Sequence, residues 1–151
     1  MAEHLDFLGR ATPQSFAGMQ EHHIEEVVKL RAHHDADGAL LDGSQARYRL
    51  RFTSAQLPQA RAFWSIKLYD ERYDLADNPI GRYSRGSPDK DLTYAADGSL
   101  EIVIQAEPPG DKLSNWLPAP KGPFNLFLRA YLPGQAMIDQ TYAPPAVERV
   151  K

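Results

Sequence analysis

The 151-residue sequence contains no cysteine, and it has no apolar run as long as a membrane-spanning helix. The absence of cysteine excludes disulfides, thiolate metal sites and a cysteine nucleophile. Without a run of about 20 apolar residues, we expect no membrane span. The N-terminus, "MAEHLDFLGR", lacks the basic and apolar regions of a signal peptide. We therefore expect the chain as written to be cytoplasmic.

The sequence also lacks a strong excess of positive or negative charge. The formal net charge is -3, the pI is near 5.9, and basic residues are scattered among acidic ones. This distribution gives no basic patch that would match a phosphate backbone, so we expect no nucleic-acid partner. A chain of this length suits one domain, which buries roughly 68–70% of the surface of its unfolded chain. A hydrophobic core is therefore expected to hold the fold together without cross-links.

The first third of the chain carries the signature of a helix from about Pro13 to His34. Thr12 is a suitable N-cap and Pro13 suits the first helical position. Apolar residues recur at helical spacing, namely Phe16, Met19, Ile24, Val27, Val28 and Leu30. This pattern predicts an N-terminal helical segment over residues 1–34. Its apolar face would pack on another surface, for example between the subunits of a homo-oligomer.

After Gly43 the hydrophobic period changes to two, which indicates β-strands. Strands are predicted at residues 47–52, 63–70, 124–132, 137–142 and 146–150, and as a hairpin over residues 92–105 around Asp97-Gly98. Pro144-Pro145 places the last strand at a sheet edge. Several short strands after one helix predict a mainly β fold, an antiparallel jelly-roll-like sandwich preceded by an N-terminal α-helix.

The histidines do not predict a metal site. His22 and His23 lie eleven residues before His33 and His34. In the predicted helix this separation is about 16 Å, far more than the ligands of one ion span. The stretch "DADGALLDG", Asp35 to Gly43, lacks the regular acids of a calcium loop and predicts a turn instead. We expect neither a metal nor a cofactor.

Catalytic motifs are equally weak. "GRYSRGS" has two residues between glycine and serine, where a nucleophile elbow has one. Acidic residues that would suit a carboxylate pair are Asp70, Glu71, Asp74, Asp77, Asp89, Asp91, Asp97 and Glu101. Their spacing selects no pair, because most of them lie in turn sequences. A cofactor-free hydrolase or lyase that uses two of them is an alternative to a binding protein.

Aromatic residues next to arginine and asparagine form the best candidate site. The candidate ligand-binding residues are Tyr69, Arg82, Tyr83, Asn115, Trp116, Arg129 and Tyr131. Such a surface would stack on a sugar ring or hold an anionic group. The alternative is structural, with Trp116 closing the core and Arg129 pairing with an acid on the next strand.

Several blocks of the sequence, in order and spacing, resemble the DUF1214 family. They are "HDADGALLDG", "YRLRFTSAQLP", "FWSIKLYD", "NPIGRYSRG", "DGSLEI", "NWLPAPKGPFNLFLRAYLP" and "YAPPAVERV". The resemblance spans residues 35–151 and implies a β-rich, jelly-roll-like domain without an assigned biochemical role. In many bacterial and some giant-virus proteins, this domain is the C-terminal partner of a DUF1254 domain, which is missing from this sequence.

The chain departs from the family pattern in one loop. Family members often have asparagine where this chain has Gly81 and isoleucine where it has Arg85. If this loop contacts a ligand, its preference is altered by the gained charge. Taken together, the sequence favours a non-catalytic ligand-binding or structural module. A carbohydrate-like or envelope-associated small molecule is the expected ligand.

Overall fold

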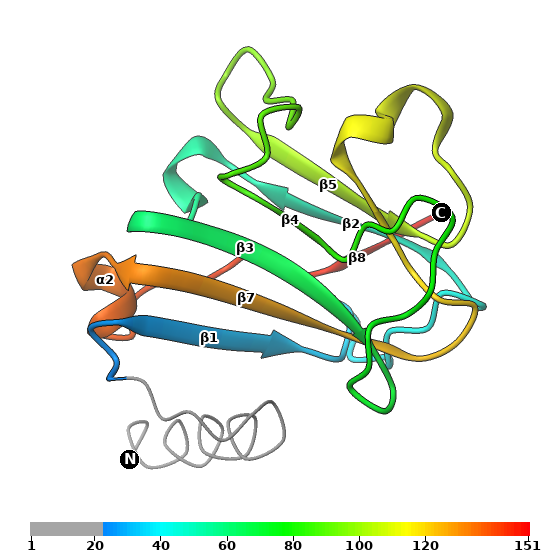
Figure 1. Ribbon diagram of the computed structural model, residues 1–151, viewed down its shortest axis with the longest axis horizontal. Coiled ribbons are helices and arrows are strands. Elements are labelled where there is room, and N and C mark those ends of the chain that lie inside the picture. The colour runs from blue at the N-terminus through cyan, green and yellow to red at the C-terminus, as the bar shows by residue number, and fades with distance from the viewer. Residues whose placement is uncertain (1–22) are drawn as a thin grey trace.

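The stretches in which apolar and polar residues alternate form most of the strands in the computed structural model, which describes residues 23–151 (Figure 1). Within these residues the strands are β1 (Val27–Ala32), β2 (Arg47–Phe52), β3 (Ala60–Asp70), β4 (Ser84–Gly86), β5 (Leu100–Gln105), β6 (Trp116–Pro118), β7 (Phe124–Pro133) and β8 (Glu148–Val150). The short helices are η1 (Ser54–Gln56), η2 (Gly110–Asn115) and α2 (Gln135–Ile138). None of the helices in this part of the chain is long and apolar enough to cross a membrane.

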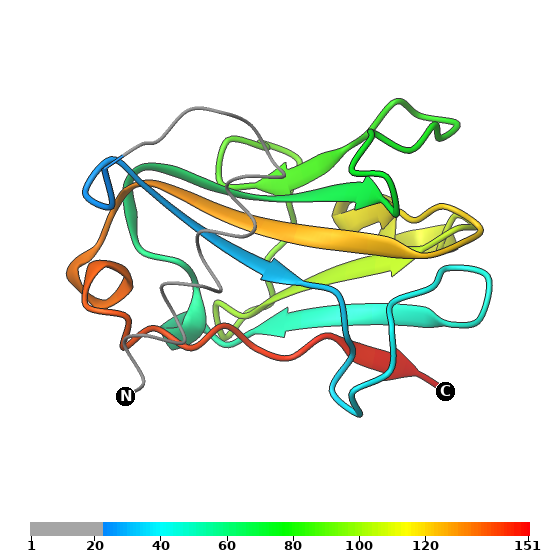
Figure 2. The same ribbon diagram turned by 90° about the horizontal axis from the view of Figure 1, so that it is seen from below.

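The strands form two sheets that pack face to face, as Figure 2 shows from the side. The first sheet has the order β1-β7-β3-β4, and the second has the order β6-β5-β2-β8. Neighbouring strands are antiparallel except for β5 and β6, which are parallel. The predicted mainly β sandwich is confirmed at this level.

The core lies between the two sheets and follows from the period-two pattern. In β2, Tyr48, Leu50 and Phe52 are buried, whereas the arginines between them are exposed. In β7, alternate residues from Phe124 to Ala130 face the same core. Because the side chains of a strand alternate between its two faces, the remaining residues of each strand form the outer faces of the sandwich.

The predicted N-terminal helix is wrong where the structure describes it. Residues 27–32 form β1, which pairs along its whole length with β7. Two adjacent β-branched valines favour an extended strand, and Val28 packs in the core between the sheets. The β-sandwich therefore begins before the predicted boundary at residue 34. The first part of the predicted helix, up to residue 22, lies outside the described residues.

Two further strand predictions are wrong. Residues 92–96 form no strand, because β5 pairs with β2 and β6 instead. Asp97-Gly98 does form a turn, with Gly98 at a φ of +79°. Residues 137–142 form the end of α2 and an irregular segment. The last strand, β8, lies at the edge of the second sheet, as the proline pair predicts.

Gly86 of β4 approaches β3 so closely that no side chain fits there. A Cβ atom at this position would collide with the carbonyl oxygen of Trp64 and lie 2.6 Å from the Cα atom of Ser65. We expect Gly86→Ala to lower the free energy of unfolding by about 2 kcal/mol or more, because rigid backbone cannot move aside. Urea unfolding followed by circular dichroism measures this change. Gly122→Ala is the control, since no atom of the described residues other than its chain neighbours lies within 4 Å of its added Cβ. Equal losses for the two variants would show that the close approach of Gly86 to β3 does not limit stability.

Candidate functional site

The outer face of the first sheet gathers basic and aromatic side chains from three strands. The register places Lys29 of β1 opposite Arg129 of β7, and Arg31 opposite Phe127. On the other side of β7, Lys67 of β3 also lies opposite Phe127. Residues that face each other in an antiparallel pair share one face of the sheet. We call this surface the cationic face; it comprises Lys29, Arg31, Phe63, Lys67, Tyr69, Tyr73, Phe127, Arg129 and Tyr131.

Three of the four cations on this face lie over aromatic rings. The Arg129 guanidinium is 5.6 Å from the ring centroid of Tyr69 and 5.5 Å from that of Phe127. The Lys67 ammonium is 5.7 Å from the Tyr69 centroid, and the Arg31 guanidinium is 5.8 Å from that of Tyr73. Such contacts are worth about 0.5–1 kcal/mol at exposed sites. They hold the cations in place but leave their net charge unneutralised.

No carboxylate balances these cations within the described part of the chain. The ion pairs among residues 23–151 involve other basic residues, and no outer position of β1, β3 or β7 is acidic. Like charges directly opposite each other, as Lys29 and Arg129 are, destabilise a sheet. Burial and the charge of Arg129 both lower the pKa of Lys29. The cationic face is therefore a local excess of positive charge on a chain whose net charge is -3.

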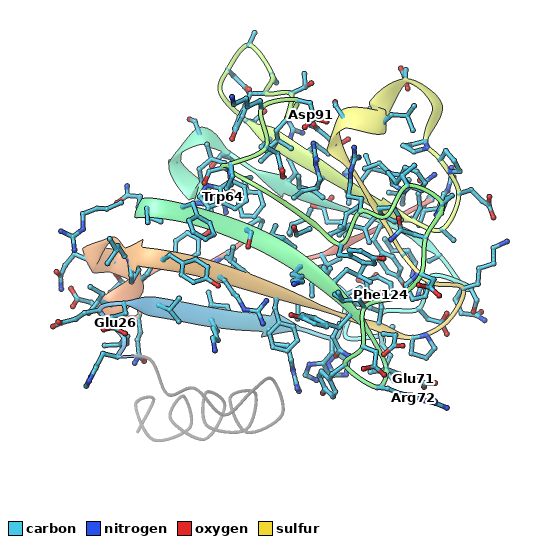
Figure 3. The ribbon with its side chains drawn as sticks, viewed as in Figure 1. Glu26, Trp64, Glu71, Arg72, Asp91 and Phe124 are labelled. Carbon is cyan, nitrogen blue, oxygen red and sulfur yellow. The ribbon has the colours of Figure 1, made fainter. Side chains whose placement is uncertain are left out.

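Contacts between aromatic rings lie at both ends of the cationic face. At one end Phe63 and Tyr131 stack with their ring centroids 4.3 Å apart. At the other end the turn that follows β3 brings Tyr73 edge-on to Phe127, and Arg31 Nη1 donates a hydrogen bond to the Tyr73 hydroxyl at 2.8 Å. Figure 3 labels Glu71 and Arg72 on this turn. Tyr73 has a φ of +65°, a strained conformation for a bulky residue.

Three of the seven predicted ligand residues, Tyr69, Arg129 and Tyr131, lie on the cationic face. Arg129 Nη1 donates a hydrogen bond to the Tyr69 hydroxyl at 3.1 Å. Arg129 has no acid opposite it on either neighbouring strand, because Ser65 of β3 and Lys29 of β1 occupy these positions. The predicted alternative of a cross-strand ion pair is therefore wrong for this residue.

The other four predicted residues lie elsewhere. Arg82 donates hydrogen bonds to the carbonyl oxygens of Leu113 and Trp116, at 2.6 and 2.9 Å. Tyr83 is half-buried, and its carbonyl oxygen accepts the amide proton of Leu68. These contacts join the segment before β4 to β3 and to the second sheet.

Asn115 and Trp116 have their polar groups satisfied within the protein. The Asn115 side chain bonds the backbone of Thr93 through both its oxygen and its nitrogen, and it also donates to the Glu101 carbonyl oxygen. Trp116 is 0% exposed, and its indole nitrogen donates to the Gln105 carbonyl oxygen at 2.9 Å. Trp116 is therefore not part of a surface that could bind a ligand. The contacts of both residues favour the alternative hypothesis, in which they stabilise the fold.

The charge gained at Arg85 serves the scaffold. Its side chain is 5% exposed and lies 2.7 Å from Asp91 and 3.7 Å from Asp89. Arg82 lies 3.7 Å from the other oxygen of Asp91. We call these four residues the polar seam, because they tie β4 of the first sheet to the loop that follows it and, through Arg82, to β6 of the second. Figure 3 labels Asp91 at this border.

Most of the predicted catalytic acids have structural contacts. Asp70 and Asp97 each accept a hydrogen bond from the backbone amide two residues later, which is typical of aspartate in turns. Asp89 and Asp91 belong to the polar seam. Their oxygens therefore stabilise loops and ion pairs.

A polar hollow of about 450 Å³ lies beside η2. Glu101, another of the predicted catalytic acids, is one of the residues that line it. Asp111 also lines it, together with Lys112, whose ammonium lies 2.7 Å from the Glu101 carboxylate. Thr93 and Ser114 hydroxyls bond each other at 3.0 Å. Glu101, Lys112, Thr93, Ser114 and Asn115 are therefore bonded to one another around this hollow.

The histidines do not converge on a metal site in the part of the chain that the structure describes. The rings of His33 and His34 are 4.2 Å apart. Over residues 23–151, no three side chains of the metal-ligating types are grouped closely enough to hold an ion. Asp35 accepts hydrogen bonds from the amides of Asp37 and Ala39, which confirms that this stretch is a turn.

The sequence reasoning missed six members of the cationic face, namely Lys29, Arg31, Phe63, Lys67, Tyr73 and Phe127. The signal that identifies most of them is the alternation within the strands. In "VVKLRA" and "FWSIKLYD" the residues at alternate positions face away from the core. For Phe63, Lys67 and Phe127 this signal is present in strands that the sequence predicts, whereas for Lys29 and Arg31 it depends on residues 27–32 being taken as a strand.

The comparison with known families agrees with this architecture. The profile of the family described as "Protein of unknown function (DUF1214)" matches residues 26–135, which include both β1 and β7. The chain belongs to the DUF1214 family. This match also places β1 inside the family domain, although the sequence resemblance begins only at residue 35. No curated protein matches the chain.

Two solved structures resemble the DUF1214 chain. The VPA0106 protein from Vibrio parahaemolyticus is 29% identical with a TM-score of 0.79, over 91% of this chain and 34% of that one. A putative uncharacterized protein from Burkholderia cenocepacia is 20% identical with a TM-score of 0.47, over 99% of this chain and 42% of that one. The DUF1214 chain thus spans less than half the length of either protein.

The polar seam predicts a particular response to acid. The hydrogen bond from Arg85, together with the charges of Arg85 and Arg82, lowers the pKa of Asp91 below its usual 3.8. A carboxylate whose pKa is lower in the folded protein stabilises the fold above its unfolded pKa, and this contribution is lost as the pH falls through the folded pKa. We expect the free energy of unfolding of the wild type to fall more steeply than that of Asp91→Asn between about pH 4 and about pH 2.

Urea unfolding at a series of pH values measures these slopes. Asp77→Asn is the control, because Asp77 is an exposed loop aspartate outside the polar seam. It should retain the wild-type slope. Identical slopes for the wild type and Asp91→Asn would show that the seam does not stabilise the fold.

Proposed function

We propose that this DUF1214 chain is a non-catalytic ligand-binding module that holds a carbohydrate-like or envelope-associated ligand on the cationic face. One observation carries the proposal. Four cations from three neighbouring strands share a surface with tyrosines, and no carboxylate of residues 23–151 pairs with them. A fold selected for stability alone would avoid the Lys29 and Arg129 pairing, because opposed like charges are unfavourable. A ligand with an anionic group would offset this cost.

The cationic face has the features of a preorganised binding surface. Its cations lie on paired strands, and Arg129 and Arg31 are each fixed by a hydrogen bond to a tyrosine hydroxyl. A guanidinium has five donors, so most of them stay available to a ligand after this one bond. Side chains that are already ordered lose less conformational entropy on binding.

The remaining predicted residues do not support a second site. The polar groups of Arg82, Asn115 and Trp116 bond the main chain, and a ligand would have to displace these bonds. Val28 and Leu30 pack within the sandwich, so they support no oligomer built on an exposed helix. The two paired sheets are enough to hold these strands in place, and a jelly-roll-like topology stays a prediction.

Arg129→Gln tests the proposed function. We expect the variant to bind at least tenfold more weakly, a loss of about 1.4 kcal/mol, because the central cation of the face is removed. Its melting temperature should change by only a few degrees, because the lost hydrogen bond and cation–π contacts of Arg129 are partly offset by the removal of its repulsion with Lys29. A thermal-shift screen of neutral and acidic oligosaccharides identifies the ligand, and isothermal titration calorimetry then measures its affinity for both proteins.

The matched control is Arg47→Gln, which removes an exposed arginine from β2 of the second sheet. This variant should bind as the wild type does. Equal binding by Arg129→Gln and the wild type would place the site elsewhere. A screen in which no oligosaccharide raises the melting temperature would reject the carbohydrate-like ligand.

A further inference from the structure

The cations of the face are spaced in two rows. Neighbouring strands lie roughly 4.8 Å apart, and alternate residues of one strand lie about 6.8 Å apart. Lys29 and Arg129 form one row on adjacent strands, whereas Arg31 and Lys67 form the next row with Phe127 between them. The positive charges are therefore distributed over an area several ångströms across in both directions. A ligand with one anionic group would meet only part of this pattern.

From this arrangement we infer that the ligand of the cationic face is an acidic polysaccharide, with carboxylates on successive sugar units that meet both rows of cations. The inference rests on the proposed function and adds the charge and the polymeric nature of the ligand. A polymer with one carboxylate on each ring presents its charges at repeated short intervals, as the two rows require. Arg129 and Arg31 suit carboxylates because the planar guanidinium forms paired hydrogen bonds with them.

The aromatic rings favour a saccharide over a single-stranded nucleic acid. Single-strand binders stack successive bases on open aromatic faces. Here Phe63 and Tyr131 stack on each other, and Phe127 is 0% exposed. One cation from β7 and one from β3 approach the ring of Tyr69. Phe63 is the one exposed ring of the face, whereas the four cations are partly exposed between partly or fully buried rings. The accessible cations match carboxylates, and one exposed ring offers no row of stacking surfaces for successive bases.

The electrostatics of Lys29 agree with this inference. Lys29 is half-buried, and both burial and Arg129 lower its pKa. A carboxylate placed between the two side chains would interact favourably with both. The binding of several carboxylates at once would also make the affinity depend steeply on salt, because each contact is electrostatic.

The test compares oligomers of galacturonic acid with the same oligomers after methyl esterification, titrated into the full chain by calorimetry. Esterification removes the charge and keeps the sugar, so we expect at least tenfold weaker binding. The tetramer should bind more tightly than the monomer, and Lys67→Gln should weaken tetramer binding several-fold while lowering the melting temperature by no more than a few degrees, since it loses one cation–π contact. Arg47→Gln is again the control and should bind normally.

Each other outcome decides against the inference in a distinct way. Equal binding of the acid and its ester would reject the charge requirement, although a loss on Arg129→Gln would still support the proposed function. Tighter binding of inorganic polyphosphate or of oligo-dT with matched charge would show that the face takes phosphates. If neither acidic nor neutral oligosaccharides bind, both the inference and the proposed function are wrong. The comparison of acid with ester uses the wild-type protein, so it does not depend on the folding of a variant.

Discussion

The pairing of β7 with its two neighbours is the constraint on which the rest of the structure depends. β7 lies between β1 and β3, and it pairs with β3 from one end of that strand to the other. Because side chains alternate, a shift of one residue in this register would turn Arg129 into the core and expose Leu128. The burial of the apolar residues of β7 therefore determines that Arg129 lies on the outer face. Burial on one side of the strand determines the chemistry displayed on the other.

The strands with strict alternation could be predicted from the sequence. β2, β3 and β7 each carry enough alternating apolar residues to exclude a helical period. β1 was ambiguous, because Val27, Val28 and Leu30 fit a helical stripe as well as a strand. Only the long-range pairing with β7 decides between the two, and a local pattern does not contain that information.

The candidate site was predictable to the extent that it lies on those same strands. Tyr69, Arg129 and Tyr131 occupy outer positions of β3 and β7, whereas Lys29 and Arg31 were hidden by the helical interpretation of β1. Arg82, Asn115 and Trp116 illustrate the opposite error. Their residue types suit ligand binding, but their side chains donate hydrogen bonds to main-chain carbonyl oxygens of segments that are distant in the sequence. The Asn115 and Trp116 side chains accordingly hold β6 to β5 and to the loop at Thr93, and the Trp116 carbonyl oxygen accepts the bond from Arg82 that reaches the segment before β4.

The position of β1 at the border of the first sheet has a consequence for the behaviour of the protein in concentrated solution. Among the described residues, β1 has a strand neighbour on one side only. An edge strand is open to pairing with the edge of another molecule, and proteins commonly prevent this with lysine or arginine. Lys29 and Arg31 supply such charges, so two copies that approach through β1 repel each other. The positive charge that is costly within one sheet is thus expected to oppose association through the open edge of β1.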